Sequence, residues 1–235
     1  MSNLAFNQVL ASVTVSVKSE QYIFDHEPHL VEVLEPIANQ KNWYWPGVAL
    51  YTVENEKLEE IRRLLQISLS NLIGRYETNA PETAQSLIQL KKTISSWRLA
   101  QRLPIKVDYD LARIDTSANP RLPKGEYVLD LTIRKDSVQL FGAVNKPTEI
   151  PHIPHSDVSE YIVNQNLTEL ANKDLVILIQ TDGRKIIAPV AYWNKKHQEA
   201  MPGSQIFVPF KESWLQPEFE RVNQQIMALA HNRLW

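Results

Sequence analysis

Apolar and polar positions along the chain follow two periods, one typical of strands and one typical of helices. Valine alternates with polar residues at 12–18, which predicts a strand with one buried face, and residues 21–25 are expected to be its hairpin partner. Apolar residues then recur at helical spacing: Leu30, Val33, Leu34 and Ile37. They predict a short helix, which Pro36 is expected to limit or bend.

Two longer amphipathic helices are predicted next. Residues 55–76 place their leucines and isoleucines along one stripe, with charged residues mostly elsewhere. Pro81 is expected to open a second helix that ends near Pro104. Its expected apolar face consists of Ala84, Leu87, Ile88, Ile94 and Trp97. Two helices joined by a short polar link form a helical hairpin, and β-rich sequence on both sides indicates an insertion into the first β unit.

The remaining pattern predicts short strands, one short helix and a C-terminal helix. The expected strands are residues 106–113, 127–133, 138–143, 148–153, 175–179, 186–192 and 205–210. A short helix is expected at 157–163, and Pro217 is expected to open an amphipathic C-terminal helix. Gly142 lies inside a predicted strand, so that either a bulge falls there or another backbone comes close.

The order hairpin, helix and further strands occurs twice along the chain, although residue identities between the copies are weak. We therefore predict an α+β fold with two β-grasp (ubiquitin-like) domains, an inserted helical hairpin and a C-terminal amphipathic helix. The predicted boundaries are 1–53 plus 105–135 for the first domain, 54–104 for the hairpin, 136–212 for the second domain and 213–235 for the last helix.

Composition excludes several classes of function. A net charge of −2 argues against binding to a nucleic-acid backbone, and the lack of cysteine excludes disulfides, thiolate zinc sites and a cysteine nucleophile. No apolar run is long enough to predict a membrane-spanning helix. The motifs of serine hydrolases, phosphate-binding loops and zinc proteases are missing, and 27 acidic residues single out no glycosidase pair. No catalytic residue, cofactor or metal site is predicted, which leaves an enzyme without support but not excluded.

Several segments, taken in their order and spacing, resemble the GfcC family of bacterial capsule-biosynthesis proteins over nearly the whole chain. They are residues 44–47, Arg113 with 119–122, 140–144, 189–195 and 201–204. The resemblance implies two SLBB-like β-grasp domains, similar to periplasmic domains of the polysaccharide export channel Wza, and a final helix similar to the channel's membrane-lining helix. It also implies a periplasmic protein of a capsule or exopolysaccharide operon. No leader is visible in the chain, so this localisation rests on the resemblance alone.

The resemblance further implies a pocket with an arginine before an Asn-Pro loop, which by position is Arg113. A guanidinium suits carboxylate, phosphate or sugar hydroxyl groups, such as those of acidic capsule sugars. Alternatively, Arg113 forms an ion pair with Asp110 or Asp115 that only fixes the loop. The candidate pocket consists of Arg113, Asp110, Asn119, Tyr44 and Trp43.

Aromatic residues near these segments have two interpretations. They could stack against sugar rings, or they could anchor the core and the loops. These residues are Trp43, Tyr44, Trp45, Tyr192 and Trp193. Trp45 and Trp193 are expected to be anchors, and both interpretations stay open for Trp43 and Tyr44. His152 and His155 are expected to be turn residues, because their spacing across two prolines does not bring both to one metal ion.

The expected function is that of an accessory protein in capsule or exopolysaccharide assembly or export, which binds polysaccharide or an export protein near Arg113. The C-terminal helix either packs on its own β domain or docks onto a partner in a membrane-associated complex. Two other functions stay open, a polysaccharide-modifying enzyme and a purely structural partner of the export channel.

Overall fold

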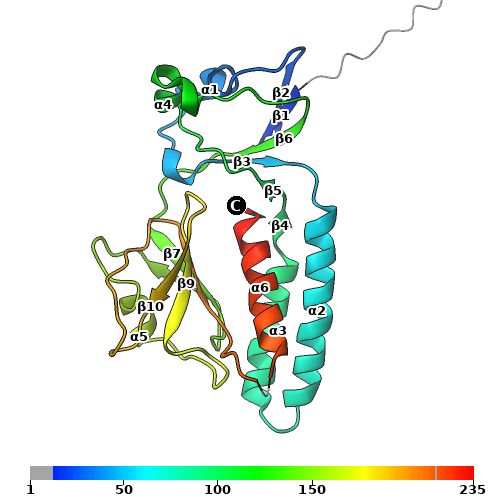
Figure 1. The fold of residues 1–235 in the computed structure, drawn as a ribbon, viewed down its shortest axis with the longest axis vertical. Helices are drawn as coiled ribbons and strands as arrows, with labels where there is room; N and C mark the ends of the chain where they lie inside the picture. Colours follow the sequence, from blue (N-terminus) through cyan, green and yellow to red (C-terminus); the bar gives the residue numbers. More distant parts are fainter. Residues whose placement is uncertain (1–12, 215) are drawn as a thin grey trace, which may run out of the picture. The chain divides into compact units, whose positions relative to one another are not determined.

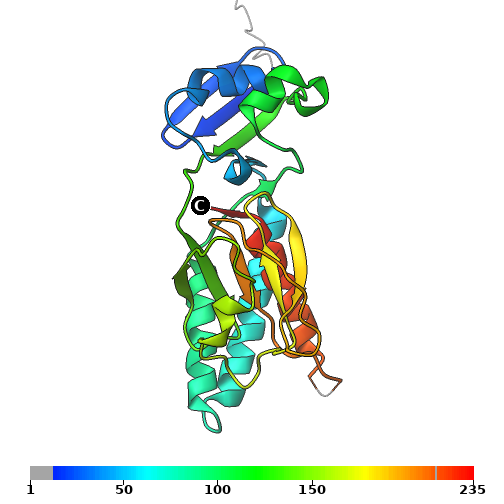
Figure 2. The ribbon, with the colours of Figure 1, turned by 90° about the vertical axis from the view of Figure 1, so that its left-hand side faces the viewer.

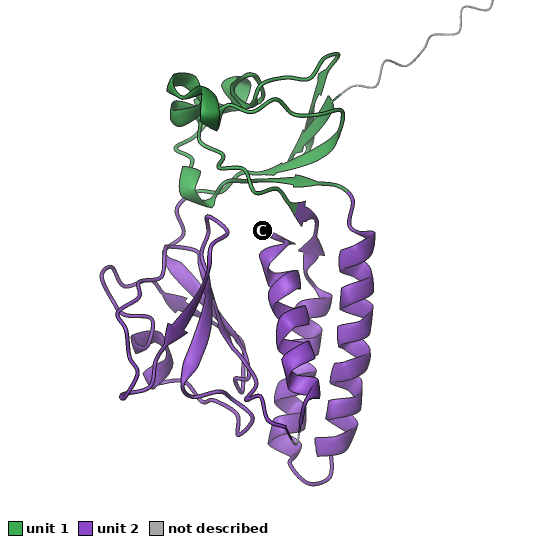
Figure 3. Cartoon of the chain, in the orientation of Figure 1, with its two compact units in different colours: residues 1–53, 102–133 green, residues 54–101, 134–235 purple. Residues whose placement is uncertain are grey.

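The computed structural model describes residues 13–214 and 216–235. The chain divides into two compact units, each built from two separate segments (Figure 3). Unit 1 contains the chain up to Val53 together with Arg102–Ile133, and unit 2 contains Glu54–Gln101 together with Arg134–Trp235. Each unit has its own sheet and its own hydrophobic core, so that the fold is a mixture of helices and sheets.

Unit 1 is organised around a five-stranded sheet in the order β2-β1-β6-β3-β5 (Figure 1). Its strands are β1 Val13–Val17, β2 Glu20–Phe24, β3 Ala49–Thr52, β5 Gln101–Arg102 and β6 Gly125–Asp130. Its helices are α1 Leu30–Ala38 and α4 Tyr109–Ile114, with 3₁₀ turns η1 Trp45–Gly47 and η2 Thr116–Ala118. The predicted first hairpin is confirmed, and β1 also pairs in parallel with the late strand β6.

The alternating valines of β1 and the apolar face of α1 form the centre of the unit 1 core. Val13, Val15 and Val17 are buried, as the alternation predicts, while Ser12 lies outside the described residues. Helix α1 buries the side chains predicted for it: Leu30, Val33, Leu34 and Ile37. Pro36 lies inside α1 and the helix ends two residues later, which agrees with the limit expected from a proline.

The prediction of a strand at residues 106–113 is wrong, because the chain forms helix α4 there. The side chain of Asp108 accepts a hydrogen bond from the backbone N–H of Leu111 at 3.1 Å, which caps the start of the helix. The alternation of Val107, Tyr109 and Leu111 favours a strand only weakly. The hydrogen bond from Leu111 to the side chain of Asp108 favours a helix start, and the helix forms. Arg113 therefore lies in the last turn of a short helix.

Unit 2 contains a second five-stranded sheet in the order β10-β9-β11-β7-β8. Its strands are β7 Ser137–Gly142, β8 Thr148–Pro151, β9 Leu175–Ile179, β10 Lys185–Pro189 and β11 Gln205–Val208, with the short helix α5 Glu160–Val163. Strand β7 pairs antiparallel with its hairpin partner β8 and parallel with the late strand β11. The same arrangement occurs in unit 1, so the order of elements that recurs in the sequence produces two sheets with equivalent pairing.

Three helices of unit 2 lie alongside one another on one side of its sheet (Figures 1 and 2). They are α2 Glu56–Tyr76, α3 Pro81–Ser95 and α6 Glu218–His231. One core cluster contains leucines of α2 and α3, apolar residues of α6 such as Phe219 and Ile226, and sheet residues such as Phe207. The helical hairpin is therefore packed with the sheet and the last helix of unit 2.

Helix α3 differs from its prediction in two respects. It ends at Ser95 rather than near Pro104, because the following residues form β4 Arg98–Leu99, which pairs with β12 Arg233–Leu234 at the end of the chain. Ile88 is 43% exposed, and the small residues Thr83 and Ser86 are buried instead. The Ser86 hydroxyl donates to the backbone oxygen of Glu82, which satisfies its polar group inside the packed face.

The last residues of the chain form an aromatic and cationic cluster that the sequence pattern does not indicate. The guanidinium carbon of Arg233 lies 5.2 Å from the ring centroid of Trp97 and 4.0 Å from that of Trp235. Its Nη1 donates to Oε1 of Gln139 at 2.8 Å, and burial lowers the pKa of Arg233 to about 10. This cluster fixes the end of α6 against β4 and β7.

Gly142 takes the second of its two predicted roles, the close approach of another backbone. Its φ is +109°, and a Cβ built on it would lie 2.2 Å from the backbone oxygen of Val208. Gly142 and Val208 are paired in the parallel register of β7 and β11. A side chain at residue 142 would therefore separate the two central strands.

We predict that Gly142→Ala lowers the free energy of unfolding of unit 2 by about 2–4 kcal/mol, because it combines backbone strain with a steric clash. Gly74→Ala is the matched control, since a Cβ at Gly74 in α2 meets nothing within 4 Å. The control should be neutral or more stable by up to about 1 kcal/mol. Urea unfolding followed by circular dichroism measures both, and equal midpoints for the two variants would contradict the prediction.

Candidate functional site

Arg113 presents an exposed guanidinium at the end of α4. Its guanidinium carbon lies 5.5 Å from the ring centroid of Tyr109, one turn earlier in the helix. Within residues 13–214 and 216–235, Arg113 makes no ion pair with Asp110 or Asp115. The alternative in which Arg113 only fixes the loop through an acid is therefore not the arrangement in the structure.

Asp115 is occupied by other partners. Its carboxylate accepts hydrogen bonds from the hydroxyl of Ser117 at 2.7 Å and from the backbone N–H of the same residue at 2.8 Å. These bonds lower the pKa of Asp115, and the bond from the hydroxyl of Ser117 has the larger effect. Asp110 is exposed in the first turn of α4. The charged groups of Arg113 and Asp110 therefore both face solvent on the same short helix.

Asn119 connects its loop to the start of α1. Its side-chain oxygen accepts the backbone N–H of Val31 at 2.9 Å, and its backbone oxygen lies 2.9 Å from Nδ1 of His29. The first N–H groups of a helix have no partner within the helix, so Asn119 supplies one of those missing acceptors. The contacts of this residue are those of a structural link between loop and helix.

Trp43 and Tyr44 lie in the turn before η1. Trp43 is 7% exposed, and its indole N–H donates to the backbone oxygen of Ile37 at 2.8 Å. Tyr44 is partly buried, and its backbone N–H donates to the oxygen of Thr132 at 2.9 Å. The environment of Trp43 is that of a core anchor with its polar tip satisfied. The pocket that the resemblance implies around Arg113 stays a prediction.

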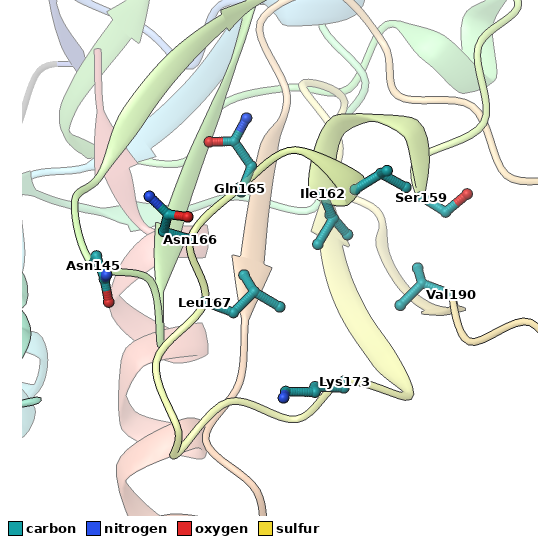
Figure 4. Close-up of a pocket in the computed structure, with 9 residues that line it drawn as sticks. Asn145, Ser159, Ile162, Gln165, Asn166, Leu167, Lys173 and Val190 are labelled. Atoms are coloured by element: carbon teal, nitrogen blue, oxygen red, sulfur yellow. The ribbon is translucent and has the colours of Figure 1, made fainter.

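A surface depression of about 550 Å³ lies in unit 2, and the sequence pattern did not indicate it (Figure 4). It is lined by Asn145, Ser159, Ile162, Val163, Gln165, Asn166, Leu167, Lys173 and Val190. In Figure 4, Ile162 and Leu167 lie between the three amide side chains on one side and Ser159 and Val190 on the other. The lining thus combines an apolar centre with amides and one cation, and it contains no carboxylate.

The strand directions of the second sheet explain why these residues meet. Strands β7 and β11 are parallel, and β9 is antiparallel to β11 and to β10, so the carboxyl ends of β7 and β10 share an edge with the amino end of β9. Asn145 and Val190 follow the first two strands, and Lys173 precedes the third. The backbone N–H of Asn145 donates to the oxygen of Asn166 at 2.9 Å, which joins two of the lining segments. A run of polar residues at 164–166 was the available signal in the sequence.

The loop after β10, which begins at Val190 in the lining of this depression, exposes two aromatic residues. Tyr192 is fully exposed and Trp193 is 76% exposed. The expectation that Trp193 is a core or loop anchor is therefore wrong. The next residues of the loop have partners of their own, since Asn194 donates to the backbone oxygen of Asp174 and Lys195 lies near Asp157. The ring of Trp193 is exposed to solvent.

Asp157 holds the far end of this loop. It is 3% exposed, and its carboxylate accepts the backbone N–H groups of Ser159 at 3.0 Å and Gln198 at 2.9 Å. The ammonium of Lys195 lies 3.4 Å away. Desolvation raises the pKa of Asp157, but the hydrogen bonds and Lys195 together outweigh it, so that the pKa is below its usual value. The folded state therefore favours the ionised form of Asp157.

His152 and His155 are both predicted from the sequence to be turn residues. His152 Nε2 lies 2.9 Å from the backbone oxygen of Ala200, and His155 has a φ of +63° in a turn. Among the residues that the structure describes, no group of three histidine, cysteine, aspartate or glutamate side chains could hold a metal ion. In the same part of the chain, no helix is long and apolar enough to cross a membrane.

We predict that Asn119→Ala lowers the free energy of unfolding of unit 1 by about 1–2 kcal/mol, since the N–H of Val31 loses its acceptor. Asn119→Asp keeps an oxygen at the same place and should change stability far less. Thermal unfolding of both variants tests the assignment. A loss of the same size in both would show that the hydrogen bond from Val31 is not the cause.

We predict that Asp157→Asn destabilises unit 2 by about 1–3 kcal/mol at neutral pH. The folded pKa lies below the ordinary value of about 3.9, so the stabilisation is complete above that value and is lost as the pH falls through the folded pKa. The difference between the protein and the variant should therefore shrink on acidification. Urea midpoints measured from pH 7 to pH 3 test this, with Asp174→Asn as the exposed control, and a difference independent of pH would refute it.

Comparisons with known proteins identify the family of the chain. The family described as "Capsule biosynthesis GfcC, N-terminal" matches residues 8–134, and "Capsule biosynthesis GfcC C-terminal" matches residues 146–235. The chain is also similar to "Uncharacterized protein YjbG" of Escherichia coli (strain K12), with 29% identity over 232 residues that cover 97% of this chain and 93% of that protein. The two family matches together span nearly the whole sequence. The chain therefore belongs to the capsule biosynthesis GfcC family.

Proposed function

We propose that this protein is a periplasmic accessory factor in the assembly or export of capsule or exopolysaccharide, and that it binds an acidic polysaccharide through Arg113. The observation that carries the proposal is the exposed guanidinium of Arg113, which has no carboxylate partner among the described residues and lies against Tyr109. A guanidinium binds a planar carboxylate through two parallel hydrogen bonds. Membership of a capsule-biosynthesis family supplies the class of ligand.

Binding rather than catalysis is the chemistry that suits this group. An arginine stays protonated in proteins, so it attracts and orients an anion but does not transfer a proton near neutral pH. Its contact with the face of Tyr109 limits the positions that the guanidinium can take. We therefore propose a non-catalytic role, in which the protein holds or guides the polymer.

We also propose that both sheets are β-grasp (ubiquitin-like, SLBB-like) domains. The support is their common topology, in which a first hairpin is followed by a helix and the first strand pairs in parallel with the last. Two similar modules in one chain offer two related surfaces to a long polymer or to an export protein. This arrangement is compatible with contacts to machinery built from similar domains.

The last helix constrains how an export partner could dock. The apolar face of α6, including Phe219, Val222 and Ile226, lies in the core of unit 2. A membrane-associated complex through α6 would therefore use the exposed polar face, which carries Glu220 and Arg221, while the apolar face stays packed. Point changes on this face test such docking better than deletion of the helix, because deletion would remove part of the core.

We predict that Arg113→Ala weakens binding of hexagalacturonate, an acidic oligosaccharide, by about tenfold, as expected for the loss of one charge-assisted contact. Arg113→Lys should bind with intermediate affinity, because the charge remains but the planar fork is lost. Arg63→Ala is the matched control, since Arg63 is also exposed but is paired with Glu60.

Isothermal titration calorimetry with hexagalacturonate, and with the neutral maltohexaose for comparison, measures these affinities. Equal affinity of the native protein and Arg113→Ala would remove Arg113 from the binding site. Release of shorter sugars during the titration would instead favour a polysaccharide-modifying enzyme.

A further inference from the structure

The depression of unit 2 and the exposed aromatic loop share a border. Val190 lines the depression, and Tyr192 and Trp193 follow it by two and three residues. Consecutive Cα atoms are about 3.8 Å apart, so the Cα atom of Trp193 lies within about 11 Å of that of Val190. The aromatic loop therefore begins at the wall of the polar depression.

The lining of the depression suits a ligand that has both hydroxyl groups and negative charge. Amides such as Asn145, Gln165 and Asn166 each carry donors and an acceptor, as sugar hydroxyls require. Lys173 brings a positive charge, and no carboxylate in the lining offsets it. Val163, which is 78% exposed, and the partly buried Leu167 supply the apolar surface that the C–H face of a sugar ring can cover.

The aromatic loop is held at both ends, although its rings are exposed. The backbone N–H of Val190 and the amide Nδ2 of Asn194 both donate to the backbone oxygen of Asp174, at 3.0 and 3.1 Å. At the far end, Asp157 accepts the backbone N–H of Gln198. Asp157 also binds Ser159 of the depression wall, so one buried carboxylate fixes both parts of the surface.

Exposed aromatic rings on a fixed loop are informative. Loops carried by a rigid scaffold are frequent binding sites. Tyrosine and tryptophan offer a large contact area with little conformational freedom to lose. The neighbouring Lys196 is exposed and adds positive charge to the same loop, whereas Lys195 is paired with Asp157.

We infer that this surface of unit 2 is a second binding site for acidic glycan, separate from Arg113 in unit 1. In this site Lys173 binds a uronic-acid carboxylate, the amides bind hydroxyl groups, and Tyr192 and Trp193 stack against adjacent sugar rings. The choice of a glycan rests on the proposed function, while the position of the site rests on the geometry of unit 2 alone.

Backbone amide NMR of the full chain with added hexagalacturonate tests this inference and locates the binding. We expect shifts at Asn145, at residues 165–173 and in the loop 190–198, in addition to shifts near Arg113. The shifts in unit 2 should persist in Arg113→Ala. Lys173→Gln and Trp193→Ala should each weaken the unit 2 affinity by about five- to tenfold.

Matched controls come from the same unit. Lys211→Gln removes an exposed lysine, and Trp214→Ala removes a tryptophan that is 87% exposed, both outside the depression. Neither should change the affinity of the unit 2 site. Unchanged chemical shifts elsewhere in each variant would show that the fold is retained.

The possible outcomes separate this inference from the proposed function. Shifts confined to the surroundings of Arg113 would overturn the second site and leave the proposed function standing. Shifts confined to unit 2 would support the second site and remove Arg113 from the proposed function. Equal shifts with maltohexaose, or no loss of affinity in Lys173→Gln, would overturn the assignment to an acidic glycan, and no shifts in unit 2 would overturn the site itself.

Discussion

The parallel pairing of an early strand with a late strand is the constraint on which each unit depends. In unit 2, β7 and β11 approach so closely at Gly142 that a Cβ would lie 2.2 Å from the oxygen of Val208. This pairing closes the sheet between the hairpin β7-β8 and the pair β9-β10. Everything between β7 and β11 must then return to the same sheet, and this brings three connecting segments to one edge. Unit 1 repeats the arrangement with β1 and β6.

The hydrophobic core of unit 2 is covered by helices as well as by its sheet. Helices α2, α3 and α6 share one core with that sheet, and the end of the chain is fixed by Arg233 between Trp97 and Trp235. The apolar face of α6 is therefore already used inside the unit. Helix α6 is therefore part of the folded core of unit 2. Only its polar face is available to contact a partner.

The two surfaces considered for glycan binding use different physical means. Arg113 offers a single exposed guanidinium supported by Tyr109, which suits one carboxylate. The surface of unit 2 offers amides, a lysine, apolar side chains and two aromatic rings, which suit an extended chain of sugars. The lining of the unit 2 depression contains no carboxylate, and the described residues hold no group of three potential metal ligands.

Periodicity in the sequence determined the strand β1, the helices α2 and α6, and the repeated order of elements, because these depend on which face of a local element is apolar. The resemblance to the GfcC family, and not periodicity, suggested Arg113. Tertiary structure decided the rest. The cap on Asp108 turned a predicted strand into α4, and the pairing of β4 with β12 ended α3 early. The depression in unit 2 and the exposure of Trp193 arise where segments distant in sequence meet at one sheet edge, and local periodicity carries no information about such a meeting.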